Sequence, residues 1–194
     1  MKPALRLCAL LAALAGLAPA HGAPLGLDKP LLFEEGSFQL GTTANGSPVG
    51  WTINPGNYKS FDMSFLLPSS EGNKYAKLIN NDITQIFRLM TEIDLPPGKG
   101  RTLRISARLK VTDLVQDPAT EWASAQIGFD MRDVSGKWDW RGTTPLRLQS
   151  STRDWIDREV IFKIPDTVTG LRVMPGLYKA TGTLEIDDIQ VYVE

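Results

Sequence analysis

The sequence is poor in the residues that most often build metal and nucleophilic sites, since its 194 residues include one cysteine and one histidine. Cys8 lies in an apolar N-terminal stretch, so the mature chain offers no disulfide framework. His21 alone supplies neither a zinc site nor the base of a nucleophile–base pair. A surplus of charge is also missing, because the formal net charge is −1 with both signs interspersed. This balance argues against nucleic acid or an anionic membrane as the partner.

The N-terminus has the pattern of a secretory signal peptide. A positively charged start and an apolar run over residues 7–17 precede small residues that end at Ala20 or Ala23. The run is shorter than the ~20 apolar residues that a membrane helix needs. We therefore expect residues 1–23 to be a leader cleaved after Ala20 or Ala23, and the mature protein to be secreted or periplasmic. The remaining length fits one domain.

Alternation of apolar and polar residues dominates the chain after the leader, and long helical patterns are absent. This period of two predicts strands at 87–93, 103–112, 125–132, 160–164 and 171–173, separated by turn residues. The side chains expected to face a core are those of Leu103, Ile105, Ala107, Leu109, Val111, Ala125, Ile127, Phe129 and Met131. We predict an all-β fold, a two-sheet antiparallel β-sandwich of the jelly-roll type.

The last predicted strand contains an irregularity. Leu184 and Ile186 alternate in one phase, whereas Ile189 and Val191 alternate in the other. One extra residue at Asp187-Asp188 accounts for the change of phase, so we expect a β-bulge there. Such a bulge re-aims a side chain, in this case a carboxylate.

Several segments resemble, in order and spacing, the landmarks of cellulase-associated carbohydrate-binding modules with the galactose-binding-like jelly-roll fold. They are Phe33-Glu34-Glu35-Gly36-Ser37-Phe38-Gln39, Gly50-Trp51, Gly98 to Arg108, Trp155, Phe162-Lys163-Ile164-Pro165 and Gly182 to Val191. The resemblance covers residues 31–194. It implies two opposed antiparallel sheets and a glycan bound on the concave face or by edge loops.

The resemblance also implies a structural Ca²⁺ ion, although no cofactor is required. The positions that correspond to its ligands are Gln39, Asp187 and Asp188. Gln39 presents a neutral amide oxygen, which is a weaker ligand for a hard cation than a carboxylate.

Aromatic side chains provide the apolar half of a sugar site, because an indole packs against the C–H face of a sugar ring. Trp138 and Trp140 follow a turn, and residues at i and i+2 point the same way in an extended segment. Trp122 is a further candidate in a loop. The alternative is that these tryptophans pack at the rim of the sandwich. For Trp51 and Trp155 we expect core packing.

Polar side chains provide the hydrogen-bonding half of such a site. The candidates are Arg88, Arg108, Gln126, Asp130 and Arg132, with Tyr75 as an additional aromatic contact. Arg108 and Arg132 are the preferred pair, since guanidinium groups bind vicinal hydroxyls or a uronic-acid carboxylate bidentately. The alternative is an ordinary solvated sheet face.

We predict a secreted, non-catalytic carbohydrate-binding protein, an accessory to glycoside hydrolases that recognises a plant or microbial polysaccharide or oligosaccharide. A structural or protein-binding jelly roll without a sugar site is the alternative. A glycoside hydrolase is a remote one. The string Glu185-Ile186-Asp187-Asp188-Ile189-Gln190 resembles the E-x-D-x-x-E strand of jelly-roll β-glucanases. Its last position is an amide, which cannot exchange the proton of general acid–base catalysis.

Overall fold

The computed structural model describes residues 34–44, 47–53, 61–68, 74–96, 98–140 and 142–194. The predicted leader and both predicted cleavage sites lie outside these residues. Within them, the only helix is the 3₁₀ helix η1 (Glu34–Ser37). No helix in this part of the chain is long and apolar enough to cross a membrane.

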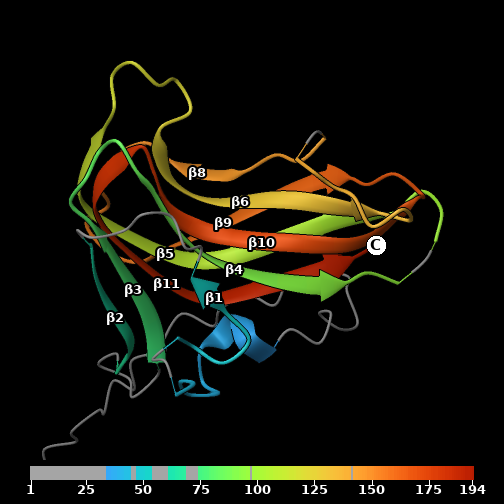
Figure 1. The fold of residues 1–194 in the computed structure, drawn as a ribbon, viewed down its shortest axis with the longest axis horizontal. Coiled ribbons are helices and arrows are strands. Elements are labelled where there is room, and N and C mark those ends of the chain that lie inside the picture. The colour runs from blue at the N-terminus through green and yellow to red at the C-terminus, as the bar shows by residue number, and fades with distance from the viewer. Residues whose placement is uncertain (1–33, 45–46, 54–60, 69–73, 97, 141) are drawn as a thin grey trace, which may run out of the picture.

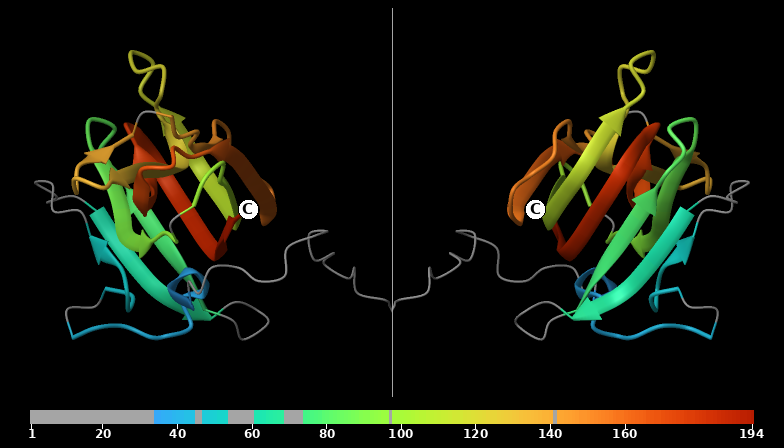
Figure 2. Two further views of the ribbon diagram at one scale, coloured as in Figure 1. Left: turned by 90° about the vertical axis from the view of Figure 1, so that its right-hand side faces the viewer. Right: turned by 90° about the vertical axis from the view of Figure 1, so that its left-hand side faces the viewer.

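In the described part of the chain, eleven strands form two antiparallel sheets. The front sheet has the order β1-β4-β10-β6-β7, with β8 also paired to β6, and the rear sheet has the order β2-β3-β11-β5-β9. Figure 1 shows the front-sheet strands in the order β8, β6, β10, β4, β1, and Figure 2 shows the two layers from their ends. The strands are β1 (Thr52–Ile53), β2 (Phe61–Pro68), β3 (Lys74–Asn80), β4 (Ile86–Asp94), β5 (Thr102–Gln116), β6 (Ser124–Asp133), β7 (Trp138–Asp139), β8 (Leu146–Leu148), β9 (Ile156–Lys163), β10 (Val168–Tyr178) and β11 (Ala180–Val193).

The core lies between the sheets and is built by the alternation seen in the sequence. Every residue of β5 and β6 that was predicted to face inward is buried, from Leu103 to Val111 and from Ala125 to Met131. β4 and β10 contribute residues such as Leu89 and Leu171 from the front sheet, and β11 contributes Ile186 from the rear sheet. Burial of these side chains is the main favourable term in folding. The predicted two-sheet antiparallel sandwich is confirmed.

The predicted bulge in the last strand is also confirmed. Asp187 pairs with Arg108 of β5, but the next pair along the strand joins Gln190 to Ser106, so β11 has one extra residue between these two pairs. Asp188 has a φ of 49°, in the left-handed region. This local geometry lets Ile189 and Val191 regain the core face, where both are buried.

The segment that enters the sandwich packs Trp51 in the core, as predicted. Its indole is 3% exposed and stacks on Phe38, with 5.4 Å between the ring centroids. The indole N–H donates a hydrogen bond to the carbonyl of Glu35 at 2.9 Å.

The sequence patterns did not reveal β2 and β3, which precede the first predicted strand.

Candidate functional site

The outer face of the front sheet gathers most of the predicted polar residues. Phe87 and Leu89 of β4 face the core, so Arg88 faces outward. In β6 the same alternation directs Gln126, Asp130 and Arg132 outward. Trp138 of β7 pairs with Arg132 and joins this surface. Five of the nine predicted ligand contacts therefore share one face: Arg88, Gln126, Asp130, Arg132 and Trp138.

A row of charged side chains crosses this face over three neighbouring strands. Arg172 of β10 lies directly opposite Glu92 of β4 on one side and Asp130 of β6 on the other. Its Nη2 lies 2.7 Å and its Nε 3.2 Å from Oε1 of Glu92. Its Nη1 lies 3.5 Å from Oδ2 of Asp130. The guanidinium is thus held between two carboxylates.

The next row along the sheet repeats this pattern with a glycine in the middle. Gly170 of β10 lies between Asp94 of β4 and Arg132 of β6. A Cβ atom on Gly170 would lie 3.0 Å from the Arg132 guanidinium, so the missing side chain gives that group its path to Asp94. Arg132 Nη2 forms an ion pair with Asp94 Oδ1. Arg132 and Arg172 therefore both have acidic partners on this face.

The two arginines also hold the ring of Trp138. The Arg172 Cζ lies 4.0 Å from the Trp138 ring centroid, and the Arg132 Cζ lies 5.5 Å from it. A guanidinium at these distances is attracted by the ring quadrupole. Trp138 is consequently fixed by two cations that are themselves fixed by ion pairs.

The turn before Trp138 is held by one carboxylate. Oδ1 of Asp133 accepts hydrogen bonds from the hydroxyl and backbone N–H of Ser135, at 2.6 and 2.8 Å, and from the N–H of Lys137 at 3.0 Å. The hydrogen bond from the Ser135 hydroxyl, followed by that from Lys137, lowers the pKa of Asp133 below its ordinary value. Gly136 completes the turn with a φ of 83°, which costs glycine little.

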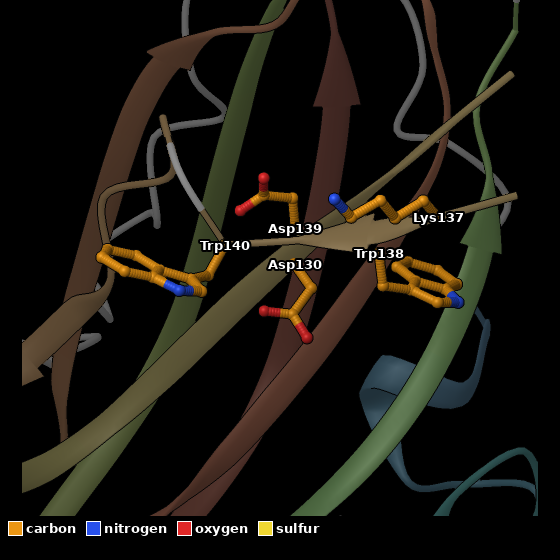
Figure 3. A pocket seen from close by; sticks show the side chains of 5 residues that line it. All are labelled: Asp130, Lys137, Trp138, Asp139 and Trp140. Atoms are coloured by element: carbon orange, nitrogen blue, oxygen red, sulfur yellow. The ribbon is translucent and has the colours of Figure 1, made fainter. Parts of the chain in front are cut away.

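An open depression lies beside β7, with a cavity volume of about 500 Å³. Its lining residues are Asp130, Lys137, Trp138, Asp139 and Trp140. In Figure 3 the indoles of Trp138 and Trp140 project to one side of the β7 ribbon, with the Asp130 carboxylate between them. Trp140 is 70% exposed. This arrangement agrees with the expectation that side chains at i and i+2 point the same way.

The backbone after β7 is tied to the front sheet. The Thr143 N–H donates to the carbonyl of Trp140 at 3.2 Å, and its hydroxyl oxygen lies 3.0 Å from the carbonyl of Phe129 in β6. These contacts hold the base of the Trp140 side chain while the indole itself remains in solvent. The rim of the depression is therefore anchored on both sides of its short strand.

The opposite end of the same face is polar and closely packed. The side-chain oxygen of Gln126 accepts hydrogen bonds from the Ser124 hydroxyl and from Arg147 Nε, both at 3.0 Å. The Tyr178 hydroxyl donates to the carbonyl of Met174 at 2.8 Å. Burial raises the pKa of Tyr178 to about 12. Arg88 lies beyond it, with Cζ 5.8 Å from the Tyr178 ring centroid.

Trp122 does not join the depression. It lies in the connection between β5 and β6, which rises beyond the ends of the sheets in Figure 2, and it is 42% exposed. Trp138 pairs near the other end of β6. Because β6 has 10 residues and a strand rises about 3.3 Å per residue, roughly 30 Å of strand separates the two.

Arg108 and Tyr75 lie on the outer face of the rear sheet, so the predicted pairing of Arg108 with Arg132 is wrong. Arg108 Nη1 lies 3.7 Å from Asp188 Oδ2, and its Cζ lies 5.6 Å from the Trp155 ring centroid. Outer faces of stacked sheets point in opposite directions, so this group cannot meet the same ligand unit as Arg132.

Trp155 also departs from its predicted place in the core. Its half-buried ring meets Tyr75 edge to face, at 5.3 Å between centroids and 82° between planes. Burial, followed by the charge of the nearby Glu185, raises the pKa of Tyr75. Trp155 leaves the core because it precedes β9 and packs over the neighbouring strands instead.

The predicted calcium ligands are already engaged in protein contacts. The Gln39 amide nitrogen donates to the carbonyls of Ser37 and Lys74, at 2.6 and 3.0 Å. Oδ1 of Asp187 accepts the N–H of Asp188, and the Asp188 carboxylate pairs with Arg108. Among the described residues, no three His, Cys, Asp or Glu side chains come together to hold a metal. The side chains of Gln39, Asp187 and Asp188 alone supply fewer than the six to eight oxygen ligands that Ca²⁺ needs.

Sequence reasoning missed Glu92, Asp94 and Arg172. Arg172 lies between Leu171 and Val173, and this alternation marks it as an outward residue. Glu92 and Asp94 alternate with Ile93 in the same way. The signal for exposure was present, but the partners that make these residues part of the site lie on other strands.

The two stacked antiparallel sheets form a β-sandwich of the jelly-roll type. Among solved structures, the chain is similar to a family 4 carbohydrate-binding module, with a TM-score of 0.53 and 20% identity over 82% of this chain and 98% of that one. It is also similar to a family 16 carbohydrate-binding module, with a TM-score of 0.50 and 16% identity over 81% of this chain and 96% of that one.

A third similarity is to a much longer protein. The enzymatically active domain of tailspike protein 4 from bacteriophage CBA120 has a TM-score of 0.55 and 12% identity over 81% of this chain, which spans only 22% of the length of that domain. No protein-family model matches the sequence, and no curated protein matches it. At these identities the similarities establish the fold, which is that of carbohydrate-binding modules as predicted.

Proposed function

We propose that this protein is a secreted or periplasmic glycan-binding protein that performs no catalysis, and that it binds sugar in the depression beside β7. The observation that carries the proposal is the pair of indoles, Trp138 and Trp140, on either side of the Asp130 carboxylate (Figure 3). The fold supports it, because solved structures of the same fold include carbohydrate-binding modules of families 4 and 16.

The chemistry of the depression suits a sugar ring. An indole face packs against the apolar C–H side of a ring, and carboxylate oxygens accept hydrogen bonds from its hydroxyls. A cavity of about 500 Å³ falls within the range of ~300–1,000 Å³ that small-ligand sites occupy. Trp138 is held in place before binding, which lowers the entropy cost of forming the complex.

Binding without turnover is supported by the β-glucanase-like string of β11, whose last position is an amide. At the β-glucanase-like string of β11, the side-chain oxygen of Gln190 accepts a hydrogen bond from the Tyr192 hydroxyl. An amide at that position leaves the motif without its third acid.

Affinity electrophoresis tests this function. Mature protein is run through gels that contain β-glucan, xylan, mannan or a polyuronate, and retardation reports binding. We expect at least one polysaccharide to retard the protein, and we expect Trp138→Ala combined with Trp140→Ala to abolish the retardation. Trp155→Ala is the matched control, since this tryptophan lies on the rear sheet, and it should be retarded like the wild type.

Three results would contradict the proposal. Mobility unchanged in every gel would favour the alternative, a structural or protein-binding jelly roll. Retardation that survives loss of both indoles but disappears in Trp155→Ala would move the site to the rear sheet. Release of reducing sugar during the same incubations would show a glycoside hydrolase instead.

Export is tested on the same material. We expect cleavage of the leader after Ala20 or Ala23, so the mature protein begins at His21 or Pro24. Mass spectrometry of protein from the periplasm or the medium measures the new N-terminus, and an intact Met1 start in those fractions would contradict the leader.

A further inference from the structure

We infer that the depression accepts an uncharged sugar unit and rejects acidic ones, and that the row of ion pairs behind Trp138 sets this selectivity. The inference rests on the proposed function and assigns the class of glycan that the same site takes. It follows from where the charges of the front face lie and from what they already contact.

The two arginines nearest the depression are committed to protein carboxylates. Arg172 is held by Glu92 at 2.7 Å and by Asp130 at 3.5 Å, and its side chain is 20% exposed. Its guanidinium also covers the Trp138 ring at 4.0 Å. A carboxylate on a sugar would need a guanidinium edge with free N–H groups. In Arg172 the edge formed by Nε and Nη2 is occupied by Glu92, and Nη1 lies beside Asp130.

Arg132 is engaged in the same way. It forms an ion pair with Asp94 and lies over Trp138 on the other side of the row. The positive charge of each guanidinium is therefore offset within the sheet. What these groups provide is a fixed position for the indole rather than a receptor for an anion.

The residues that line the depression carry a small negative balance. Asp130 and Asp139 contribute two carboxylates, and Lys137 contributes one ammonium group. A sugar hydroxyl donates to a carboxylate and gains a charge-assisted hydrogen bond. This balance stays negative when Arg172 and Arg132 are counted together with their partners Glu92 and Asp94. One net negative charge about 4 Å from a uronic-acid carboxylate lowers its affinity about fivefold under full water screening, and more where water is displaced.

Matched oligosaccharides test the inference by titration calorimetry. One is a neutral oligosaccharide with the backbone that the protein binds, the second is its C6-oxidised uronate, and the third carries protonated amino groups. We expect wild-type protein to bind the neutral compound about tenfold or more tightly than the uronate. The amino compound should bind no more tightly than the neutral one.

Two variants separate selectivity from binding. Asp130→Asn removes the carboxylate of the depression, and Glu92→Gln releases Arg172 from its main partner. Each should narrow the ratio of neutral to uronate affinity by about fivefold. The control is Asp157→Asn on the exposed edge strand β9 of the rear sheet, which should leave the ratio unchanged. Urea melts verify that every variant is folded.

The outcomes distinguish failure of the inferred selectivity from failure of the proposed glycan binding. Equal or tighter binding of the uronate by wild-type protein, tighter binding of the amino compound, or a ratio that neither variant changes would overturn the selectivity while leaving glycan binding intact. Absence of binding to all three compounds would overturn the proposed function, and the selectivity with it.

Discussion

Replacement of Arg172 by methionine perturbs the group that joins the charged row to the tryptophan. Methionine keeps an apolar stem of similar reach but removes the guanidinium. The lost contacts are the ion pair with Glu92 at 2.7 Å, the weaker one with Asp130 at 3.5 Å, and the packing over Trp138 at 4.0 Å. A second substitution, Trp138→Leu, removes the ring from the same contact.

The magnitude follows from exposure. The Arg172 side chain is 20% exposed, so its contact with the indole lies between an exposed cation–π pair and a desolvated one, about 1 kcal/mol. Its ion pairs are close to the surface and contribute about 0.5–1 kcal/mol together. We expect Arg172→Met to lower the free energy of unfolding by about 1.5–2 kcal/mol.

Urea unfolding of the wild type, both single variants and the double variant measures the coupling between the two side chains. The expected coupling energy is about 1 kcal/mol. Arg158→Met is the control, because Arg158 is exposed on β9 and contacts only the adjacent carbonyl of Asp157 among the interactions seen in the described residues. Its effect should stay within about 0.5 kcal/mol. A coupling energy near zero would refute the claim that Arg172 holds Trp138.

Three further predictions concern the buried tyrosine, a glycine beneath it, and metal. The pKa of Tyr178 is raised from 10.0 to about 12, so its contribution to stability is complete below pH 10 and is lost between pH 10 and 12. The melting temperature should therefore fall over that window, and the fall should be smaller in Tyr178→Phe. Gly128→Ala should be destabilising, since its Cβ would lie 2.8 Å from the Tyr178 hydroxyl, and Tyr178→Phe should restore part of the loss in a thermal melt; no restoration would contradict the contact. Removal of calcium with a chelator should leave the melting temperature unchanged, whereas a fall of several degrees would show a structural ion that the contacts of Gln39, Asp187 and Asp188 do not accommodate.

The strands that could be predicted are those with one buried face and one solvent-exposed face. β5 alternates from Leu103 to Val111 and β6 from Ala125 to Met131, so the buried residues of these two stretches followed from the period alone. The bulge at Asp187-Asp188 was visible as a change of phase. β3 was missed because lysine and asparagine residues interrupt its apolar positions, although Ala76 and Leu78 are buried.

Alternation does not reveal which sheet a strand joins. Arg108 and Arg132 each alternate with core residues, yet β5 pairs with β11 and β9, whereas β6 pairs with β10 and β7. Strand pairing is decided by long-range contacts, so the two arginines end on opposite surfaces. The prediction that Trp155 packs in the core was wrong for a related reason, because its partners Tyr75 and Arg108 come from strands distant in the sequence.

The candidate site was predictable in its aromatic part and hidden in its electrostatic part. Trp138 and Trp140 stand out as exposed rings after a turn. The Glu92–Arg172 pair joins residues 80 positions apart, and no local pattern links them. The consequence is that the sequence suggested arginines free to bind a ligand, whereas the structure pairs them with carboxylates.

Indole N–H resonances provide the most direct test of the glycan site, because the chain contains five tryptophans and each yields one ¹H–¹⁵N cross-peak. Titration with the polysaccharide fragment that retards the protein should shift the Trp138 and Trp140 peaks and leave the peaks of Trp51, in the core, and Trp155, on the rear sheet, unchanged. Shifts confined to Trp155, or no indole shift at saturating fragment, would contradict a sugar site in the depression beside β7.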